Sequence, residues 1–393
     1  MESAKAYKIV YCTPALYMAG GVERVLTLKA NYFAEQFGYD ITIILTEGKD
    51  KPLFYPLSDK IKVINLNINF EDLWNCSFFK KVFLYLKKQR IYRKKLSKEI
   101  VRLEPDFTVS LLRREINFIN KIKDRSIKIG EMHVNRANYR NFEPGDSNPI
   151  KKLFAKFWMH NLVSDIKKLD GFVVLTKEDR ESWKELDNVD VIPDPLPFKI
   201  NRTSSLTSKR VIAVGRYVYQ KGFDLLLQVW AKIEKQNQDW ELVIFGQGDR
   251  QPYLQIVNDL NINKEHCHLL GPTNEIENEY LKSSVFAFSS RFEGFGMVLV
   301  EAMSCGLPCV SFDCPCGPKD IISDGIDGLL VSNGDVNQMA NKLSELMNNH
   351  DEIKRLSRGA LVKAENYSID SISNTWKSLF DSLYQNKRKV NVR

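Results

Sequence analysis

Two glutamates flank a glycine-rich turn in the last third of the chain. Glu293 precedes the turn Gly294-Phe295-Gly296, and Glu301 follows it in an apolar segment typical of a helix. A turn that leads into a helix leaves free backbone N–H groups, which suit a phosphate. Two carboxylates beside that phosphate could accept hydrogen bonds from a sugar and a ribose, so we interpret the segment as a nucleotide-sugar site. The alternative is one glutamate favoured by the helix dipole and another exposed to solvent.

Two cations form a second candidate cluster, near the end of the expected strand 211–214. Arg216 and Lys221 lie five positions apart, before an expected helix that begins near Phe223. Arginine binds a diphosphate as a planar fork and lysine binds it as a point charge. At the carboxyl end of this strand, the two side chains could bind a diphosphate together. Otherwise, the two side chains are loop charges exposed to water.

A histidine and further glycines also follow expected strands. His133 comes after the strand 127–130, where it could bind a sugar or serve only as a structural side chain. Gly20 and Gly21 follow the first strand, and Gly246 follows the strand 242–245. Ligands of open parallel sheets bind beyond the carboxyl ends of strands, so these turns could converge on one cleft. No motif typical of a metal site is convincing.

Short apolar segments alternate with helical segments along the chain, which predicts parallel sheets. The phrase Val191-Ile-Pro-Asp-Pro-Leu-Pro197 interrupts this alternation and is the expected hinge between two domains. We therefore expect an α/β protein of two Rossmann-like domains, with parallel sheets that face a central cleft. The strands are expected at 8–13, 41–45, 61–65, 107–111, 127–130, 171–175, 211–214, 242–245, 268–270, 285–288 and 308–312.

Composition fits a globular protein of two domains. The chain has 393 residues, of which 44% are hydrophobic and 27% charged. No apolar run is long enough to span a bilayer, and the N-terminus resembles no signal peptide, so we expect a cytoplasmic protein. Seven cysteines are an odd number for a disulfide framework, which predicts reduced thiols. The four between 305 and 316 lack zinc-knuckle spacing, so buried thiols are favoured over a metal.

The positive charge is concentrated in the first half of the chain. Residues 1–195 contain 34 Lys+Arg against 26 Asp+Glu, whereas the remainder is balanced. Between Lys80 and Arg102, ten basic residues stand against the single acid Glu99, with apolar residues interleaved from Phe78 onward. This pattern predicts a basic amphipathic helix over about 78–102 that contacts an anionic membrane surface, and not nucleic acid. The alternative is an ordinary helix with a solvated face and its apolar stripe in the core.

Several motifs together resemble retaining glycosyltransferases of family 4, which have the GT-B fold. They occur in family order over nearly the whole chain and are highly specific as a set. The matching residues and phrases are Gly20-Gly-Val-Glu-Arg24, His133, Val191–Phe198, Val214–Asp224, Ile244–Asp249, Ser289–Gly296, Glu301–Pro308 and Gly325–Leu330. One departure is Asp194, where the family phrase usually carries Asn, and we expect little effect from it.

The resemblance implies roles for individual residues. Arg216 and Lys221 would bind the donor diphosphate, Glu301 the ribose and Glu293 the transferred sugar. His133 would lie beside the sugar, and the catalytic set would be Glu293, His133, Arg216 and Lys221. The remaining donor contacts would come from Gly20, Gly21, Gly246 and the backbone of Gly294, Phe295, Gly296 and Met297. The family needs no metal, and the nucleotide sugar is a co-substrate, so no cofactor is expected.

The resemblance also implies a domain arrangement and a substrate class. Residues 1–195, completed by a C-terminal helix at about 368–393, would bind the acceptor, and residues 196–367 would bind the donor. The phrase Phe312-Asp-Cys-Pro-Cys-Gly-Pro-Lys-Asp-Ile321 resembles a branch that transfers galactose-type sugars from UDP in surface-polysaccharide, capsule or lipopolysaccharide assembly. A lipid-linked acceptor would place the protein at the inner membrane face. Alternatives are an epimerase or a phosphorylase on the same fold, and a non-catalytic binding subunit.

Overall fold

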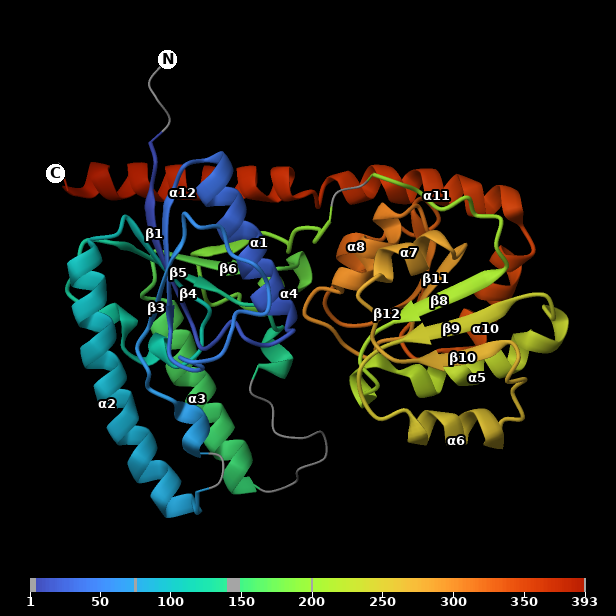
Figure 1. The fold of residues 1–393 in the computed structure, drawn as a ribbon, viewed down its shortest axis with the longest axis horizontal. Coiled ribbons are helices and arrows are strands. Elements are labelled where there is room, and N and C mark those ends of the chain that lie inside the picture. Colours follow the sequence, from blue (N-terminus) through green and yellow to red (C-terminus); the bar gives the residue numbers. More distant parts are fainter. Residues whose placement is uncertain (1–4, 74–75, 140–148, 199–200, 392–393) are drawn as a thin grey trace. The chain divides into compact units, whose positions relative to one another are not determined.

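The protein consists of two compact α/β units, which the computed structural model describes over residues 5–73, 76–139, 149–198 and 201–391 (Figure 1). The first unit comprises Met1–Leu175, Asp179–Pro195 and Ile372–Arg393. The second comprises Thr176–Glu178 and Leu196–Ser371. The last two residues of the expected C-terminal helix, 392–393, lie outside the described residues.

The first unit is built on a parallel sheet of seven strands in the order β3-β2-β1-β4-β5-β6-β7. The order changes direction between β1 and β4, because β1 pairs with β2 on one side and with β4 on the other. The strands are β1 (Lys8–Thr13), β2 (Asp40–Leu45), β3 (Lys62–Asn65), β4 (Phe107–Ser110), β5 (Ile127–Glu131), β6 (Gly171–Val174) and β7 (Val189–Val191).

Helices cover both faces of this sheet (Figure 1). On one face the core includes α1 (Gly21–Gln36) and α12 (Ile369–Asn391), the latter through Ile372, Trp376 and Phe380. On the other face, α2 (Phe78–Leu103) and α3 (Pro149–Ile166) contribute to a second core. The last helix of the chain is therefore part of the first unit's core.

The second unit repeats the same architecture with six parallel strands in the order β10-β9-β8-β11-β12-β13. Its direction changes between β8 and β11, which pair through Val211–Val285 and Ile212–Phe286. The strands are β8 (Arg210–Val214), β9 (Glu241–Phe245), β10 (Cys267–Leu270), β11 (Val285–Phe288), β12 (Cys309–Asp313) and β13 (Gly328–Ser332). The helix α4 (Lys177–Ser182) begins in the second unit and ends in the first, because the chain passes between the units after Glu178. The other helices of the second unit are α5 (Phe223–Ile233), α6 (Gln251–Asp259), α7 (Ile276–Leu281), α8 (Met297–Ser304), α9 (Pro318–Ile321), α10 (Val336–Met347) and α11 (His350–Glu365).

The expected alternation of strands and helices is confirmed, with two short strands added. β1 has the predicted bounds, whereas β7 and β13 were not expected. The expected helix after Glu293 is present and begins at Met297, directly after Gly296, which adopts the left-handed region with φ of 98°. Among the described residues, no helix has both the length and the apolar character to cross a membrane.

Candidate functional site

The site is assembled at the carboxyl ends of β8 and β11, where the strand order of the second unit changes direction. Open parallel sheets usually bind their ligands at such a change of direction, beyond the carboxyl ends of the strands. The loop after β8 carries Arg216 and Lys221, and the loop after β11 carries Glu293 and the glycine turn. The candidates from two separate stretches of sequence therefore follow neighbouring strands.

Two glycines allow the loop after β8 to approach the loops after its neighbours β11 and β9 closely. Gly222 has φ of 63°, and a Cβ added to it would come within 2.0 Å of the Ser289 carbonyl oxygen. A Cβ on Gly246 would come within 1.7 Å of the Gly215 carbonyl oxygen. Since a backbone oxygen cannot yield to a side chain, both positions require glycine. For Gly246 the structure thus supplies a packing reason in addition to the expected donor contact.

Lys221 and Glu293 form an ion pair across the two loops. The Lys221 Nζ lies 2.6 Å from Glu293 Oε1, and both side chains are largely buried. Ser290 Oγ donates to the same oxygen at 2.6 Å, and Gln220 Nε2 donates to Glu293 Oε2 at 3.3 Å. These contacts fix the carboxylate in one orientation. The sequence assigned the two residues to different parts of a ligand, and the structure brings them together.

Arg216 differs from Lys221 because its guanidinium is exposed and contacts no acceptor among the described residues. The neighbouring residue Tyr217 is buried, and the Tyr217 backbone N–H donates to the Gln247 carbonyl at 2.8 Å. The Tyr217 hydroxyl lies 2.9 Å from the Ile244 carbonyl oxygen and 3.0 Å from that of Leu270. The backbone next to Arg216 is therefore held in place, and its guanidinium at the strand end can bind an anion.

The turn before α8 presents free backbone donors. Within the described chain, no acceptor receives the backbone N–H groups of Gly294, Phe295, Gly296 or Met297. Such donors at a helix start favour a phosphate or another anion. One turn into α8, the Glu301 side chain is buried and accepts a hydrogen bond from Tyr280 Oη at 3.1 Å.

Arg291 links the same two loops and was not expected from the sequence. Its guanidinium makes two hydrogen bonds to the Asp224 carboxylate, at 2.8 and 2.6 Å, and a third to the Tyr219 carbonyl at 2.8 Å. A bidentate pair of this kind is geometrically specific. Arg291 therefore holds the Lys221 loop against the Glu293 loop. Its partner lies 67 positions away in the chain, so no local pattern could have indicated it.

In the first unit, Gly20 and Gly21 lie where α1 begins. Gly20 is the residue before the helix, and the Glu23 carboxylate lies over it. A Cβ on Gly21 would meet no atom within 4 Å, so the space above this backbone is open. The open space fits the expected approach of a ligand to this loop, which remains a prediction.

His133 belongs to a buried ionic cluster of the first unit. Its Nε2 lies 3.1 Å from Glu131 Oε1, and its Nδ1 lies 3.3 Å from Asp194 Oδ1. Glu131 also forms an ion pair with Lys29 of α1, and the Lys29 Nζ lies 4.4 Å from the centre of the Trp376 ring. Both ring nitrogens of His133 thus face carboxylates, and the side chain is only 5% exposed.

The cluster determines the charge of its members. Burial alone would lower the pKa of His133, but the charges of Asp194 and then Glu131 raise it to about 9. Burial alone would raise the pKa of Glu131, but Lys29 and then His133 lower it to about 2. Asp194, from which the sequence led us to expect little effect, is the main cause of the raised pKa of His133.

The three side chains Glu131, His133 and Asp194 could also offer ligand atoms to a metal, since these atoms lie within 4.8 Å of one another. However, the Glu131 oxygen that faces His133 also binds the Lys29 ammonium. A divalent cation would stand beside that ammonium, whereas a protonated His133 balances two cations against two carboxylates. The donor set therefore fits a proton better than a metal ion.

This charge balance predicts how stability changes with pH. The folded-state pKa of His133 lies above its ordinary value of 6.5, so its contribution is complete below pH 6.5 and is lost as the pH rises through about 9. Glu131 contributes above pH 4.5 and its contribution is lost as the pH falls through about 2. We expect the urea concentration at the midpoint of unfolding to decrease as the pH rises from 6.5 to 9. His133→Gln should flatten that decline, and an unchanged slope in this variant would contradict the assignment.

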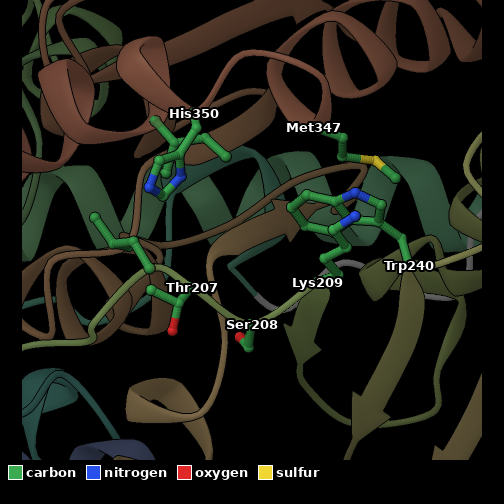
Figure 2. Close-up of a pocket in the computed structure, with 8 residues that line it drawn as sticks. Thr207, Ser208, Lys209, Trp240, Met347 and His350 are labelled. Atoms are coloured by element: carbon green, nitrogen blue, oxygen red, sulfur yellow. The ribbon is translucent and has the colours of Figure 1, made fainter.

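A pocket of 310 Å³ elsewhere in the second unit does not coincide with these residues (Figure 2). Lys209 immediately precedes β8 and Trp240 immediately precedes β9, so the pocket lies at the amino ends of the strands. Met347 and His350 line it from the end of α10 and the start of α11. Ligands of such sheets bind at the opposite ends of the strands. We therefore assign the site to the carboxyl edge.

The chain is similar to known proteins in sequence and in fold. Residues 198–361 match the family described as Glycosyl transferases group 1. This match supports a glycosyltransferase enzyme. The matched segment includes every candidate of the second unit, from Arg216 to Glu301.

Two relatives and one solved structure are similar over nearly the whole chain. The amylovoran biosynthesis glycosyltransferase AmsD of Erwinia amylovora is 26% identical, over 95% of this chain and 100% of that protein. The GalNAc-α-(1→4)-GalNAc-α-(1→3)-diNAcBac-PP-undecaprenol α-1,4-N-acetyl-D-galactosaminyltransferase of Campylobacter jejuni is 26% identical, over 92% and 95%. TarM of S. aureus, solved in complex with Fondaparinux, α-GlcNAc-glycerol and UDP, superposes with a TM-score of 0.72 at 17% identity, over 95% and 99%. The glycosyltransferase has the GT-B fold that the sequence predicted.

Proposed function

We propose that this glycosyltransferase moves a hexose from a UDP-sugar to a lipid-linked or glycan acceptor, with retention of the anomeric configuration. The main support is the edge where the exposed Arg216, the Lys221–Glu293 pair and the free N–H groups of Gly294–Met297 follow neighbouring strands. Two cations and a set of amide donors match a diphosphate. A fixed carboxylate beside them matches sugar hydroxyls, and Glu301 matches the ribose.

The reaction would proceed without a metal or another cofactor. The bond between the anomeric carbon and the diphosphate oxygen breaks, and the acceptor oxygen forms the new bond on the same face. The acceptor proton passes to the departing diphosphate, whose charge Arg216 and Lys221 stabilise. The transition state would resemble an oxocarbenium ion, as in glycoside hydrolysis.

The sugar and acceptor are proposed from two sources. The phrase at residues 312–321 resembles galactosyltransferase-type enzymes, and the Campylobacter relative is named for N-acetylgalactosamine and an undecaprenol-diphosphate saccharide. We therefore favour galactose or N-acetylgalactosamine and a role in surface polysaccharide, capsule or lipopolysaccharide synthesis, to which the name of the Erwinia relative also points. The protein would act as a peripheral protein at the inner face of the membrane, where the basic helix α2 meets anionic lipid and not nucleic acid.

A turnover assay tests this function. We expect UDP release from UDP-galactose or UDP-N-acetylgalactosamine to depend on an added lipid-diphosphate saccharide, and to be unchanged by EDTA. NMR of the product should show the anomeric configuration of the donor. Loss of activity in EDTA that added divalent cation restores would contradict metal independence. Isomerised sugar nucleotide from donor alone would identify an epimerase instead.

A further inference from the structure

The outward face of α2 is apolar near the start of the helix and basic further along. Phe79, Val82, Phe83 and Leu86 recur at the spacing of one helix face, and they are 86%, 45%, 71% and 54% exposed. Such a run of exposed apolar side chains on one surface helix is uncommon in a soluble protein and marks an interaction site. We define this set as the apolar tip of α2.

The same face continues as a cationic band. The next positions at helical spacing are Arg90, Arg93 and Lys94, and Lys87 and Lys98 border them. All five side chains are exposed, and none forms an ion pair or hydrogen bond with another part of the described chain. They are therefore available to a partner with negative charge.

Two other basic residues of α2 have structural tasks instead. Lys88 Nζ donates to the carbonyl oxygens of Ile68 and Asn69, both at 2.6 Å, and to Asp72 at 2.9 Å. Lys95 Nζ donates to the Leu66 carbonyl at 2.6 Å. On the inward side Tyr92, Leu96 and Ile100 are buried in the core. These contacts attach the helix firmly to the first unit, so its outward face is presented by a rigid support.

We infer that α2 docks on an anionic lipid bilayer, with its apolar tip inserted among the acyl chains and its cationic band against the headgroups. This inference rests on the proposed function, which includes contact of α2 with anionic lipid, and it specifies which side chains insert and which contact the headgroups. Positive charge and aromatic side chains on one helix face match the two layers of a membrane interface. The sequence suggested electrostatic contact alone, whereas the exposed tip adds a component that salt does not screen.

The test is binding of the full chain to vesicles of phosphatidylcholine, with and without phosphatidylglycerol. We expect binding to require phosphatidylglycerol and to weaken at about 1 M salt, where the Debye length falls to about 3 Å. Phe79→Ser with Phe83→Ser should weaken binding at least about tenfold at either salt concentration, since both side chains leave the acyl region. Replacing Lys87, Arg90, Arg93 and Lys94 by glutamine should remove most of the salt dependence.

Controls separate this surface from the transferase site. Val362→Ser removes an exposed apolar side chain from α11 and should bind as the wild type does. Transfer to a soluble acceptor without vesicles should be unchanged in the tip variant, so a failure of docking and a failure of the proposed function give different results. Quenching of a Phe83→Trp variant by brominated lipid, beyond that of the wild type, would support insertion. Equal binding of the tip variant, binding to phosphatidylcholine alone, or a change of oligomeric state in place of vesicle affinity would overturn the inference.

Discussion

Replacing Lys221 by alanine is expected to lower kcat/KM by about 10² to 10³-fold, the range found when one donor to a developing negative charge is removed. The variant loses the cation assigned to the diphosphate, and it also leaves the Glu293 carboxylate without the ammonium that lies 2.6 Å away in the folded chain. Steady-state kinetics with the UDP-sugar donor measure the change. A Lys221→Ala enzyme with an unchanged transfer rate would contradict the donor-site assignment.

The matched control is Lys232→Ala. Lys232 is an exposed lysine of α5, the helix that follows the Lys221 loop, and its loss should leave the rate near that of the wild type. Combining Lys221→Ala with Glu293→Gln distinguishes two origins of the effect. If the pair acts as a unit, the double variant should be less impaired than the product of the single effects. If the loss of kcat/KM in the double variant equals the product of the two single losses, the two residues act on the donor independently.

The sequence could indicate a candidate site because strand ends are local features. Gly215, Gly246 and the turn after Phe288 each follow a short apolar segment, and parallel strands place all such ends at one edge. The Lys221–Glu293 pair was not predictable in the same way. It depends on β8 lying next to β11, although their first residues are 75 positions apart in the chain. This neighbour relation follows from crossover topology and not from any local pattern.

The helix α2 shows what periodicity can and cannot indicate. Its amphipathic pattern predicted a helix, and the described helix is Phe78–Leu103 against the expected 78–102. Periodicity did not separate the buried Tyr92, Leu96 and Ile100 from the exposed Phe79 and Phe83. Both sets are apolar with helical spacing, and only the tertiary fold determines where the core ends.

Asp194 and Lys29 illustrate two kinds of missed signal. Asp194 stands in a proline-rich phrase that says nothing about a partner 61 positions earlier, so its effect on His133 needed the fold. Lys29, in contrast, could have been found. It lies on the same face of α1 as Leu26, Ala30 and Phe33, all of them buried. A charged residue within an apolar stripe requires a buried partner, which in this chain is Glu131.

Replacing Lys29 by methionine is the second change with a large expected effect, on stability instead of turnover. Both members of the Lys29–Glu131 pair are only 1% exposed, so the variant leaves a buried carboxylate with one cation fewer. Removing one partner of a buried ion pair destabilises a protein by about 3 to 5 kcal/mol. We expect a clear fall in the urea midpoint, measured by circular dichroism. Lys98→Met, at an exposed lysine of the same unit, should leave the midpoint nearly unchanged.

The double variant Lys29→Met with Glu131→Gln tests the cause of that loss. If the unpaired Glu131 charge is responsible, removing the charge should recover part of the lost stability, since uncharged replacements for both partners are often tolerated. If the loss comes instead from the Lys29 packing on Trp376, the second change should give no recovery. The double variant should also weaken the pH dependence of stability between pH 6.5 and 9, because His133 then faces only Asp194 and its pKa should fall toward its ordinary value. An unaltered pH profile would show that Glu131 does not help to keep His133 protonated.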